Sequence, residues 1–401
     1  MEIKRLTEEI LGQYMGLVAT YYELHANPEL SFAEHRTAEQ VVARLRSEDI
    51  ECRSIATTGV LAKIEGTAEG AVLRKAVVLR ADIDALPIAE QSLSPHPSQN
   101  EGVMHACGHD MHATILLGTL ALLNRHRDEL GCTIFGLFQP GEELNPGGAK
   151  SVLAENPFEG YDVVAFVGEH IEPTLPTGVV GICSGKYMAA CDELHLTIKG
   201  KGGHAALREG IVDPILPTAK LVEALYEIPA LSTEQSEPTI LSIGRIEAAG
   251  ATNIVPDSVA LQGTMRTFDE QRRAQVKKLV EYHCDNIEKK YGVVVERNFG
   301  SGYPAVFNTP QLAEMALQTV AAAFGPSAIK TLGIRPTGED FGYYTERYPS
   351  LFYRLGVGYS GEEFEARKAG ALHTPQLLPD TKAIGIGVSV MALLALRFAE
   401  L

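Results

Sequence analysis

The sequence is poor in the features that mark membrane and nucleic-acid-binding proteins. Its 401 residues include no tryptophan, and the apolar stretch Ala383–Leu396 is 14 residues long, short of the ~20 that cross a bilayer. The 51 acidic residues outnumber the 35 basic ones, and the net charge of -16 at pH 7 repels nucleic-acid phosphates. We therefore expect no membrane span and no nucleic-acid partner, and we interpret Ala383–Leu396 as a buried C-terminal helix.

Signals for export and for disulfide bonding are also missing. The N-terminal segment is charged and amphipathic, whereas a secretory signal has a basic segment followed by an apolar one. The six cysteines are scattered, without the short spacings of a disulfide framework. These absences predict a cytoplasmic protein in which most cysteines are buried thiols, with one available as a metal ligand.

The motifs of several enzyme classes are absent. The chain has no G-x-x-x-x-G-K-[ST], no G-x-S-x-G and no H-E-x-x-H, so nucleotide hydrolysis, serine-esterase and thermolysin-like activities have no support. The segment from Gly200 to Ala205 matches G-x-G-x-x-A, which keeps a nicotinamide dehydrogenase open as an alternative. Because this region lacks an apolar βαβ pattern, we interpret the segment as a turn that presents His204.

The apolar runs and amphipathic segments predict two domains. Short β-branched runs alternate with helical segments in both terminal parts of the chain, which favours an α/β domain with a parallel sheet covered on both faces. Between them, the pattern follows a β-α-β-β-α-β order, typical of a ferredoxin-like domain. We therefore predict a catalytic domain formed by residues 1–187 and 306–401, interrupted by an inserted domain over residues 188–305.

Side chains that bind metals recur after the apolar strands. In sheets of this kind, ligands and catalytic groups gather beyond the carboxyl ends of the strands. The residues at these positions, and in the segment MHACGHDMH, are Asp82, Asp84, His105, Cys107, His109, His112, Glu142, Glu143, Glu169, His170 and His373. Their recurrence at independent strand ends predicts a metal centre.

Two of these segments have spacings that fit hydrolysis at a metal centre. In Cys107-Gly108-His109, the glycine lets both flanking side chains face one ion, and a thiolate can bridge two divalent ions of the Zn, Mn, Ni or Co type. In Glu142-Glu143, one acid can bind metal while its neighbour takes a proton from the attacking water. The sequence therefore predicts an enzyme that carries out metal-dependent hydrolysis. A metal-dependent binding or scaffold protein without catalytic turnover is the alternative outside the enzyme class.

Longer motifs carry a family resemblance that spans nearly the whole chain. In order, they are LHANPELSFAEHRTA, RADIDALPI, MHACGHDMHATILLG, LFQPGEELNPGGAK, GKGGHAA, ATNIVPDSVALQGTMRTF, TGEDFGYY and LHTP. With these motifs the sequence resembles the N-acyl-amino-acid amidohydrolases, which include hippurate hydrolase, auxin-conjugate hydrolases and N-acetyldiaminopimelate deacetylase, within the carboxypeptidase-G2-like dinuclear metallopeptidases. The resemblance implies a metallopeptidase-type α/β catalytic domain and an inserted ferredoxin-like α+β domain that serves as dimerisation and lid domain.

The resemblance also implies roles for individual residues. Two divalent ions, of unresolved identity among Zn, Mn, Ni and Co, would be held by Cys107 as the bridge and by His109, Glu143, His170 and His373. Glu142 would be the general base and acid, and Asp84 would orient a ligand. His204 of the partner subunit would stabilise the oxyanion. Asn253 and Arg266 would hold the α-carboxylate of the substrate.

The activity implied by the resemblance is hydrolysis of an N-acetyl, N-benzoyl or N-aryl-acetyl amino acid by a homodimer or tetramer. Deacetylation of N-acetyldiaminopimelate and dipeptide hydrolysis are the alternatives at the same site.

Two departures from the family pattern bear on the substrate. Glu169 precedes His170 where an apolar residue is usual, which we expect to alter the polarity near the metals, and Leu207-Arg208 replaces a Pro-His pair, which we expect to alter the pocket.

Overall fold

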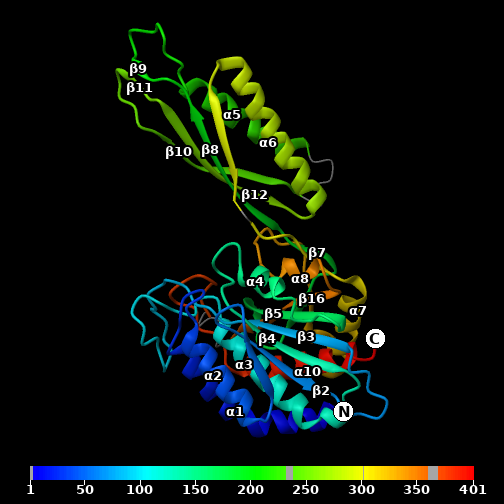
Figure 1. Cartoon of the computed structure of the whole chain (residues 1–401). Helices are drawn as coiled ribbons and strands as arrows, with labels where there is room; N and C mark the ends of the chain where they lie inside the picture. Colours follow the sequence, from blue (N-terminus) through cyan, green and yellow to red (C-terminus); the bar gives the residue numbers. More distant parts are fainter. Residues whose placement is uncertain (1–2, 232–237, 301, 360–368) are drawn as a thin grey trace. The chain divides into compact units, whose positions relative to one another are not determined.

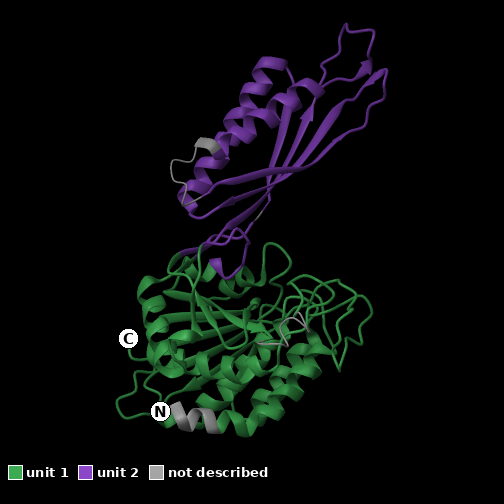
Figure 2. Cartoon of the chain, turned by 180° about the vertical axis from the view of Figure 1, so that it is seen from behind, with its two compact units in different colours: residues 1–185, 307–333, 343–401 green, residues 186–306, 334–342 purple. Residues whose placement is uncertain are grey.

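The computed structural model describes residues 3–231, 238–300, 302–359 and 369–401, and the chain divides into two compact units (Figure 1). Unit 1, green in Figure 2, comprises residues 1–185, 307–333 and 343–401, and unit 2, purple, comprises residues 186–306 and 334–342. Residues 334–342, which we placed in the second part of the catalytic domain, group with unit 2 instead. The function of unit 2 as a dimerisation or lid domain stays a prediction.

Unit 1 is built on a mixed sheet of eight strands in the order β1-β2-β4-β3-β5-β16-β6-β15. The strands are β1 Glu51–Ile55, β2 Gly59–Glu65, β3 Lys75–Asp82, β4 Thr133–Gln139, β5 Asp162–Pro176, β6 Val180–Ile182, β15 Ile329–Thr331 and β16 Ser350–Gly358. The central strands β4, β3, β5 and β16 run parallel, as predicted, whereas β2 is antiparallel to β4 and β6 to β16. The antiparallel pair β1 and β2 was missed, because β1 carries no apolar run.

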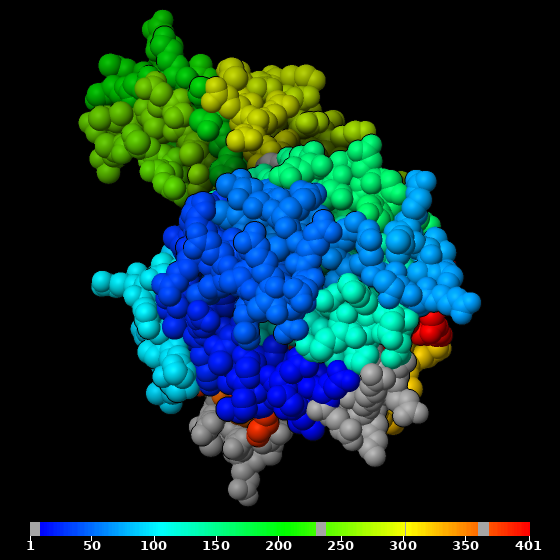
Figure 3. All heavy atoms as spheres, turned by 60° about the horizontal axis from the view of Figure 1, so that its bottom comes forward, coloured from blue at the N-terminus to red at the C-terminus, as the bar shows by residue number. Residues whose placement is uncertain are grey.

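Helices enclose this sheet. They are α1 Ile3–His25, α2 His35–Ser47, α3 His109–Arg125, α4 Gly148–Ala154, α7 Pro310–Phe324, α8 Gly342–Thr345 and α10 Lys382–Phe398, with 3-10 turns at Arg127–Glu129 and Pro326–Ala328. The predicted buried C-terminal helix is confirmed as α10. In Figure 3, α1 and α2, in dark blue, form much of one outer face.

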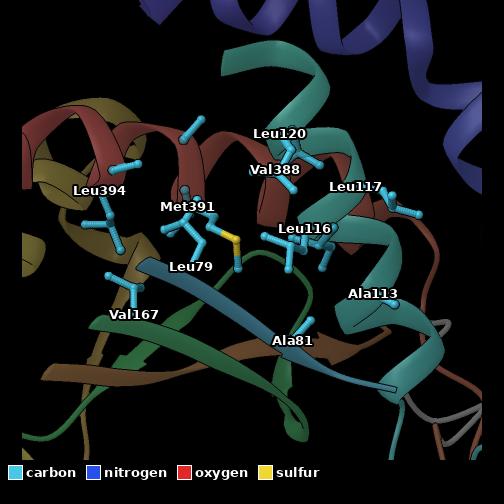
Figure 4. Packing of buried hydrophobic residues seen from close by; sticks show 14 of the residues in the cluster. Leu79, Ala81, Ala113, Leu116, Leu117, Leu120, Val167, Val388, Met391 and Leu394 are labelled. Atoms are coloured by element: carbon cyan, nitrogen blue, oxygen red, sulfur yellow. The ribbon is translucent and has the colours of Figure 1, made fainter. Parts of the chain in front are cut away.

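The core of unit 1 lies between the sheet and the two most deeply buried helices. Figure 4 shows Leu116 of α3 and Val388 and Met391 of α10 over Leu79 of β3 and Val167 of β5, all of them buried. Burying a side chain of this size stabilises the fold by roughly 1.5–3 kcal/mol relative to leaving it exposed. Within the described part of the chain, no helix combines the length and apolar character that crossing a membrane requires.

Unit 2 contains an antiparallel sheet of four strands in the order β10-β12-β8-β13. Its elements are β8 Ala190–Lys199, α5 Ile215–Glu227, a 3-10 turn at Ile228–Leu231, β10 Ile240–Ala248, β12 Ser258–Thr267, α6 Glu270–Tyr291 and β13 Val294–Phe299. The short strands of unit 2 are β9 Gly203–His204 and β11 Ile254–Val255, whereas β7 Gly185–Met188 and β14 Val306–Asn308 span the boundaries between the two units in the sequence. The order β8-α5-β10-β12-α6-β13 confirms the ferredoxin-like prediction, and both helices share one apolar core with the sheet.

Candidate metal centre

The start of α3 brings a thiol and an imidazole together through a glycine. Cys107 and His109 flank Gly108, which has a φ of 84° in the left-handed region. A Cβ at Gly108 would also lie 2.2 Å from Cδ1 of Ile171, so no other residue fits this turn without displacing its neighbours. Both flanking side chains are buried. Gly108 therefore adopts the backbone conformation that was expected to require a glycine between the two ligands.

Cys107 lies against an imidazole of β5. Its Sγ is 3.2 Å from Nε2 of His170, while Nδ1 of His170 donates to the carbonyl of Ile171 at 2.8 Å. The carbonyl can only accept, so the neutral imidazole keeps its lone pair on Nε2, toward the sulfur. Burial, together with the positive charge of Arg354, holds the pKa of His170 well below its ordinary value. The ring is therefore neutral, as a metal ligand must be.

The imidazole of His109 is oriented by a carboxylate. Its Nδ1 contacts Oδ1 of Asp84 at 3.2 Å, and its buried Nε2 has no hydrogen-bond partner among the residues that the structure describes. Burial alone would lower the pKa of His109, but the charges of Asp82 and Cys107 and the contact with Asp84 raise it well above its ordinary value. Acids and a thiol thus surround the free ring nitrogen, which favours a cation there.

Glu143 and His373 complete the cluster. Oε1 of Glu143 lies 3.2 Å from Nε2 of His373, and the amide of Glu143 donates to Oδ2 of Asp84 at 2.9 Å. His373 is held near the start of α3 because its amide donates to the carbonyl of Ala106 at 2.7 Å. Contacts with Cys107 and Glu143 raise the pKa of His373 to about 10. This exposed residue has a φ of 60°, a strained value for a residue with a side chain.

The predicted ligands fall into two groups that share one sulfur. Within each group, the ligand atoms lie within 4.8 Å of one another. The groups are Cys107, His109 and His170, and Cys107, Glu143 and His373. Thiolate, imidazole and carboxylate together suit borderline ions such as Zn, and the buried Nε2 of His109 is the donor that such an ion would satisfy. The residues present therefore fit a metal centre with Cys107 as the shared ligand.

Glu142 lies beside these groups. It is buried, with 7% of its surface exposed, and its carboxylate is within 4.8 Å of ligand atoms of His109 and Glu143. A carboxylate in this position can reach a water molecule or a leaving group at the cluster. The structure thus brings Glu142 together with all five predicted ligands and with Asp84.

A second buried network lies behind the cluster. Nδ1 of His112 contacts Oδ1 of Asp82 at 2.6 Å, its Nε2 accepts from the amide of Ile171 at 2.9 Å, and Arg80 donates to Oδ2 of Asp82 at 2.8 Å. Asp82, His109 and His112 also have the spacing of a metal group, but both nitrogens of His112 are engaged. We therefore assign Asp82 and His112 to the support of β5 and α3. Their positions at the end of β3 and on α3 were the sequence signal for this network.

Glu169 does not have the position expected from the sequence. Residues that are adjacent in a strand point to opposite faces, and β5 continues through both Glu169 and His170 to Pro176. Oε2 of Glu169 accepts from the hydroxyl of Tyr353 at 3.1 Å, and Tyr353 belongs to the hydrophobic core. Burial raises the pKa of Glu169 to about 8. Glu169 is therefore a mostly neutral core acid on the face opposite His170.

Unit 2 carries the three remaining predicted residues, at two ends of its sheet. His204 of β9 and Asn253 are neighbours, because the amide of Ala205 donates to the carbonyl of Asn253 at 2.9 Å. Nδ1 of the exposed His204 accepts from the amide of Ala206 at 3.2 Å, which leaves Nε2 free to donate. Arg266 lies at the other end of β12, paired with Cys191.

The separation of these residues follows from the register of the sheet. β12 begins at Ser258, which pairs with Lys199 near β9, and Arg266 is eight residues further along. At about 3.3 Å per residue, this places Arg266 roughly 26 Å from the end of the sheet where His204 and Asn253 lie. One subunit therefore does not bring Asn253 and Arg266 to the same carboxylate.

Comparisons with known proteins agree with this chemistry. Residues 78–397 match the family model described as peptidase family M20/M25/M40. The chain is 35% identical over 380 residues to an N-acetylcysteine deacetylase from Bacillus subtilis, with 94% of this chain and 95% of the relative covered. It is 40% identical over 308 residues to an N-acyl-L-amino acid amidohydrolase from Geobacillus stearothermophilus, with 77% and 81% covered. A solved dinuclear metal binding peptidase from Bacillus subtilis matches with a TM-score of 0.82 and 32% identity, with 97% and 99% covered.

Proposed function

Because the chain belongs to peptidase family M20/M25/M40, we propose that it is a metal-dependent amidohydrolase that splits N-acyl amino acids into a carboxylate and a free amino acid. The observation that carries this proposal is the pair of ligand groups that share Cys107, with Glu142 beside them. A scaffold without turnover would not need a buried carboxylate next to the ligands, because burying an acid costs free energy.

We propose that the site would hold two divalent ions, with Cys107 belonging to both ligand sets. His109 and His170 would complete one ligand set, and Glu143 and His373 the other. When bound, such ions would supply Lewis-acid chemistry, which polarises an acyl carbonyl and activates water. The ligand set does not single out one ion among Zn, Mn, Ni and Co.

Glu142 is the proposed proton carrier. Its carboxylate takes a proton from the attacking water and delivers it to the nitrogen of the leaving amino acid, so that the amine departs neutral. Asp84 assists by orienting His109 and by holding the amide of Glu143. Burial alone would raise the pKa of Asp84, but these contacts and the hydroxyl of Ser31 hold it below its ordinary value. Asp84 is therefore ionised when it accepts from His109.

We propose that His204 and Asn253 act in the active site of a partner subunit. The separation along β12 supports this, because a single substrate carboxylate can meet both Asn253 and Arg266 only if two copies of the chain contribute. His204 presents a free Nε2 donor, which suits stabilisation of an oxyanion. The exposed residues Leu207 and Arg208 follow it, and we propose that they shape the acyl pocket.

The dimer is proposed to form through unit 2. β10 is an edge strand of its sheet, and Arg245, Ile246 and Glu247 on it are exposed, Ile246 by 56%. An unpaired edge offers a row of backbone donors and acceptors to a second copy of the same strand. A tetramer would need a further surface.

The substrate is tested with a panel of N-acetyl, N-benzoyl and N-aryl-acetyl amino acids, each assayed with several divalent metals and after chelation. We expect metal-dependent release of the free amino acid. Strict dependence on a second amino and carboxyl group would favour the alternative, deacetylation of N-acetyldiaminopimelate, and activity on dipeptides alone would favour a dipeptidase. Absence of bound metal and of any stimulation by metal would remove the basis of the proposal.

Sharing of residues between subunits is tested with mixed dimers of the Glu142→Ala and His204→Ala variants. Each variant alone should be inactive. A mixed dimer regains one site with both groups if His204 acts in trans, so random mixing restores about a quarter of the wild-type activity. No recovery would show that His204 acts within its own chain or not at all.

A further inference from the structure

The turn that carries Glu142 contacts a buried acid from a distant part of the sequence. Glu34 precedes α2, and none of its surface is exposed. Its Oε1 accepts from the amide of Gly141 at 2.9 Å, and its Oε2 accepts from the hydroxyl of Thr58 at 2.5 Å. Gly141 is the residue immediately before Glu142. The buried carboxyl of Glu34 therefore accepts a hydrogen bond from the backbone of the turn that carries Glu142.

The peptide of Gly141 is held on every side. Its carbonyl accepts from the amide of Gly148 at 3.0 Å, which closes the turn. The ring of Phe32 packs on its Cα, since a Cβ there would lie 2.5 Å from Cζ of that ring. Beyond Glu142, the amide of Glu143 is fixed by Asp84. Glu142 thus lies between two anchored peptides, and the first of these anchors is Glu34.

We propose that Glu34 is a positioning residue that sets the place of the Glu142 carboxylate. This inference rests on the proposed function of Glu142 as the proton carrier. Proton transfer needs the carboxylate within hydrogen-bond reach of the water and of the leaving nitrogen, and a misplacement of about 1 Å can cost about 100-fold in rate. If the carboxylate of Glu34 no longer accepts from the amide of Gly141, the turn that carries Glu142 can shift. The ligands on α3 and β5 do not depend on this hydrogen bond and stay in place.

The test compares Glu34→Asp with Thr58→Val in metal-loaded enzyme. Glu34→Asp keeps the charge but is one methylene shorter, so it cannot reach Gly141 without moving α2. Thr58→Val removes the other side-chain hydrogen bond to the same carboxyl and leaves Gly141 untouched. We expect Glu34→Asp to lower kcat by about 10- to 100-fold, with KM changed less than about threefold and bound metal unchanged. We expect Thr58→Val to keep kcat within about twofold of wild type.

Each other result contradicts the inference. If Glu34 only stabilises the start of α2, both variants lower Tm to a similar extent and kcat per folded enzyme stays at the wild-type level. If Glu34 acts through the ligands, bound metal falls together with kcat. A wild type that is inactive on every N-acyl amino acid overturns the proposed function and this inference with it, whereas an active wild type and an equally active Glu34→Asp variant overturn the inference alone.

Discussion

A buried imidazolium behind the candidate centre predicts a specific dependence of stability on pH. His25, at the end of α1, has 1% of its surface exposed. Its Nδ1 contacts Oδ2 of Asp110 at 2.6 Å, and its Nε2 contacts Oε1 of Glu90 at 3.1 Å. Burial alone would lower the pKa of His25, but these two carboxylates raise it to about 10. At neutral pH the ring of His25 is therefore positively charged, and this charge stabilises the ionised carboxylates of Asp110 and Glu90.

The size of the effect follows from the two pKa values. In the unfolded chain a histidine titrates near 6.5, and each unit of pKa difference corresponds to about 1.4 kcal/mol. The raised value of about 10 in the folded state means that His25 stabilises the fold fully below pH 6.5 and loses this contribution as the pH rises through 10. The contribution is about 4 kcal/mol at pH 7 and falls below about 1 kcal/mol at pH 10.

The assay is urea unfolding of the wild type and of His25→Gln between pH 7 and pH 10. Far-UV circular dichroism is the suitable probe, because the chain has no tryptophan. We expect the variant to be less stable by about 4 kcal/mol at pH 7, within the range for removing one member of a buried charge group, and by about 1 kcal/mol or less at pH 10. His35→Gln, at an exposed histidine, is the control and should change neither value. A difference between His25→Gln and wild type that stays constant over this range would refute the reasoning.

Three further predictions concern the cluster itself. Asp84→Asn should weaken metal binding by about 10- to 100-fold, because His109 loses its charged acceptor; chelator competition measures this, and unchanged affinity would contradict it. Cys107→Ser should reduce bound metal below two ions per chain in elemental analysis, and full retention would exclude a bridging thiolate. Gly108→Ala should destabilise the fold by about 2 kcal/mol or more, because the alanine is held in a left-handed conformation and its Cβ clashes with Ile171. An unchanged urea midpoint would contradict this.

Much of the fold was open to prediction because it depends on local patterns. Apolar runs in the sequence predicted the central strands of unit 1. Amphipathic segments predicted the strands β8 and β12 of unit 2, whose side chains alternate in burial in the structure. The pair β1 and β2 escaped detection because the five residues of β1, Glu51–Ile55, are mostly polar, so burial periodicity gives no signal there.

The site could be predicted in its residue types but not in its supports. The rule that chemistry gathers at strand ends pointed to Asp84, Cys107 and Glu143, which the structure brings together. His170 and Glu169 looked like residues beyond a strand, yet β5 continues through them and turns Glu169 into the core. That outcome depends on strand length, which sequence patterns define poorly.

Contacts between distant segments were beyond the reach of the sequence. Ser31 donates to Asp84 at 2.6 Å across 53 residues, and Glu34 accepts from Gly141 across 107 residues. No periodicity or motif spacing encodes such pairs, since they depend on how α2 packs beside the sheet. The separation of Asn253 from Arg266 likewise became visible only with the register of β12.

The most direct test of the proposed mechanism is the turnover of Glu142→Gln on an N-acetyl amino acid, measured together with its bound metal. The substitution keeps the shape of the side chain and removes its ability to accept and return a proton. General acid-base catalysis contributes about 100- to 10,000-fold, so we predict a fall in kcat of at least about 100-fold with the metal content of the wild type. A variant that binds metal normally and hydrolyses the substrate at a rate close to that of the wild type would contradict the account.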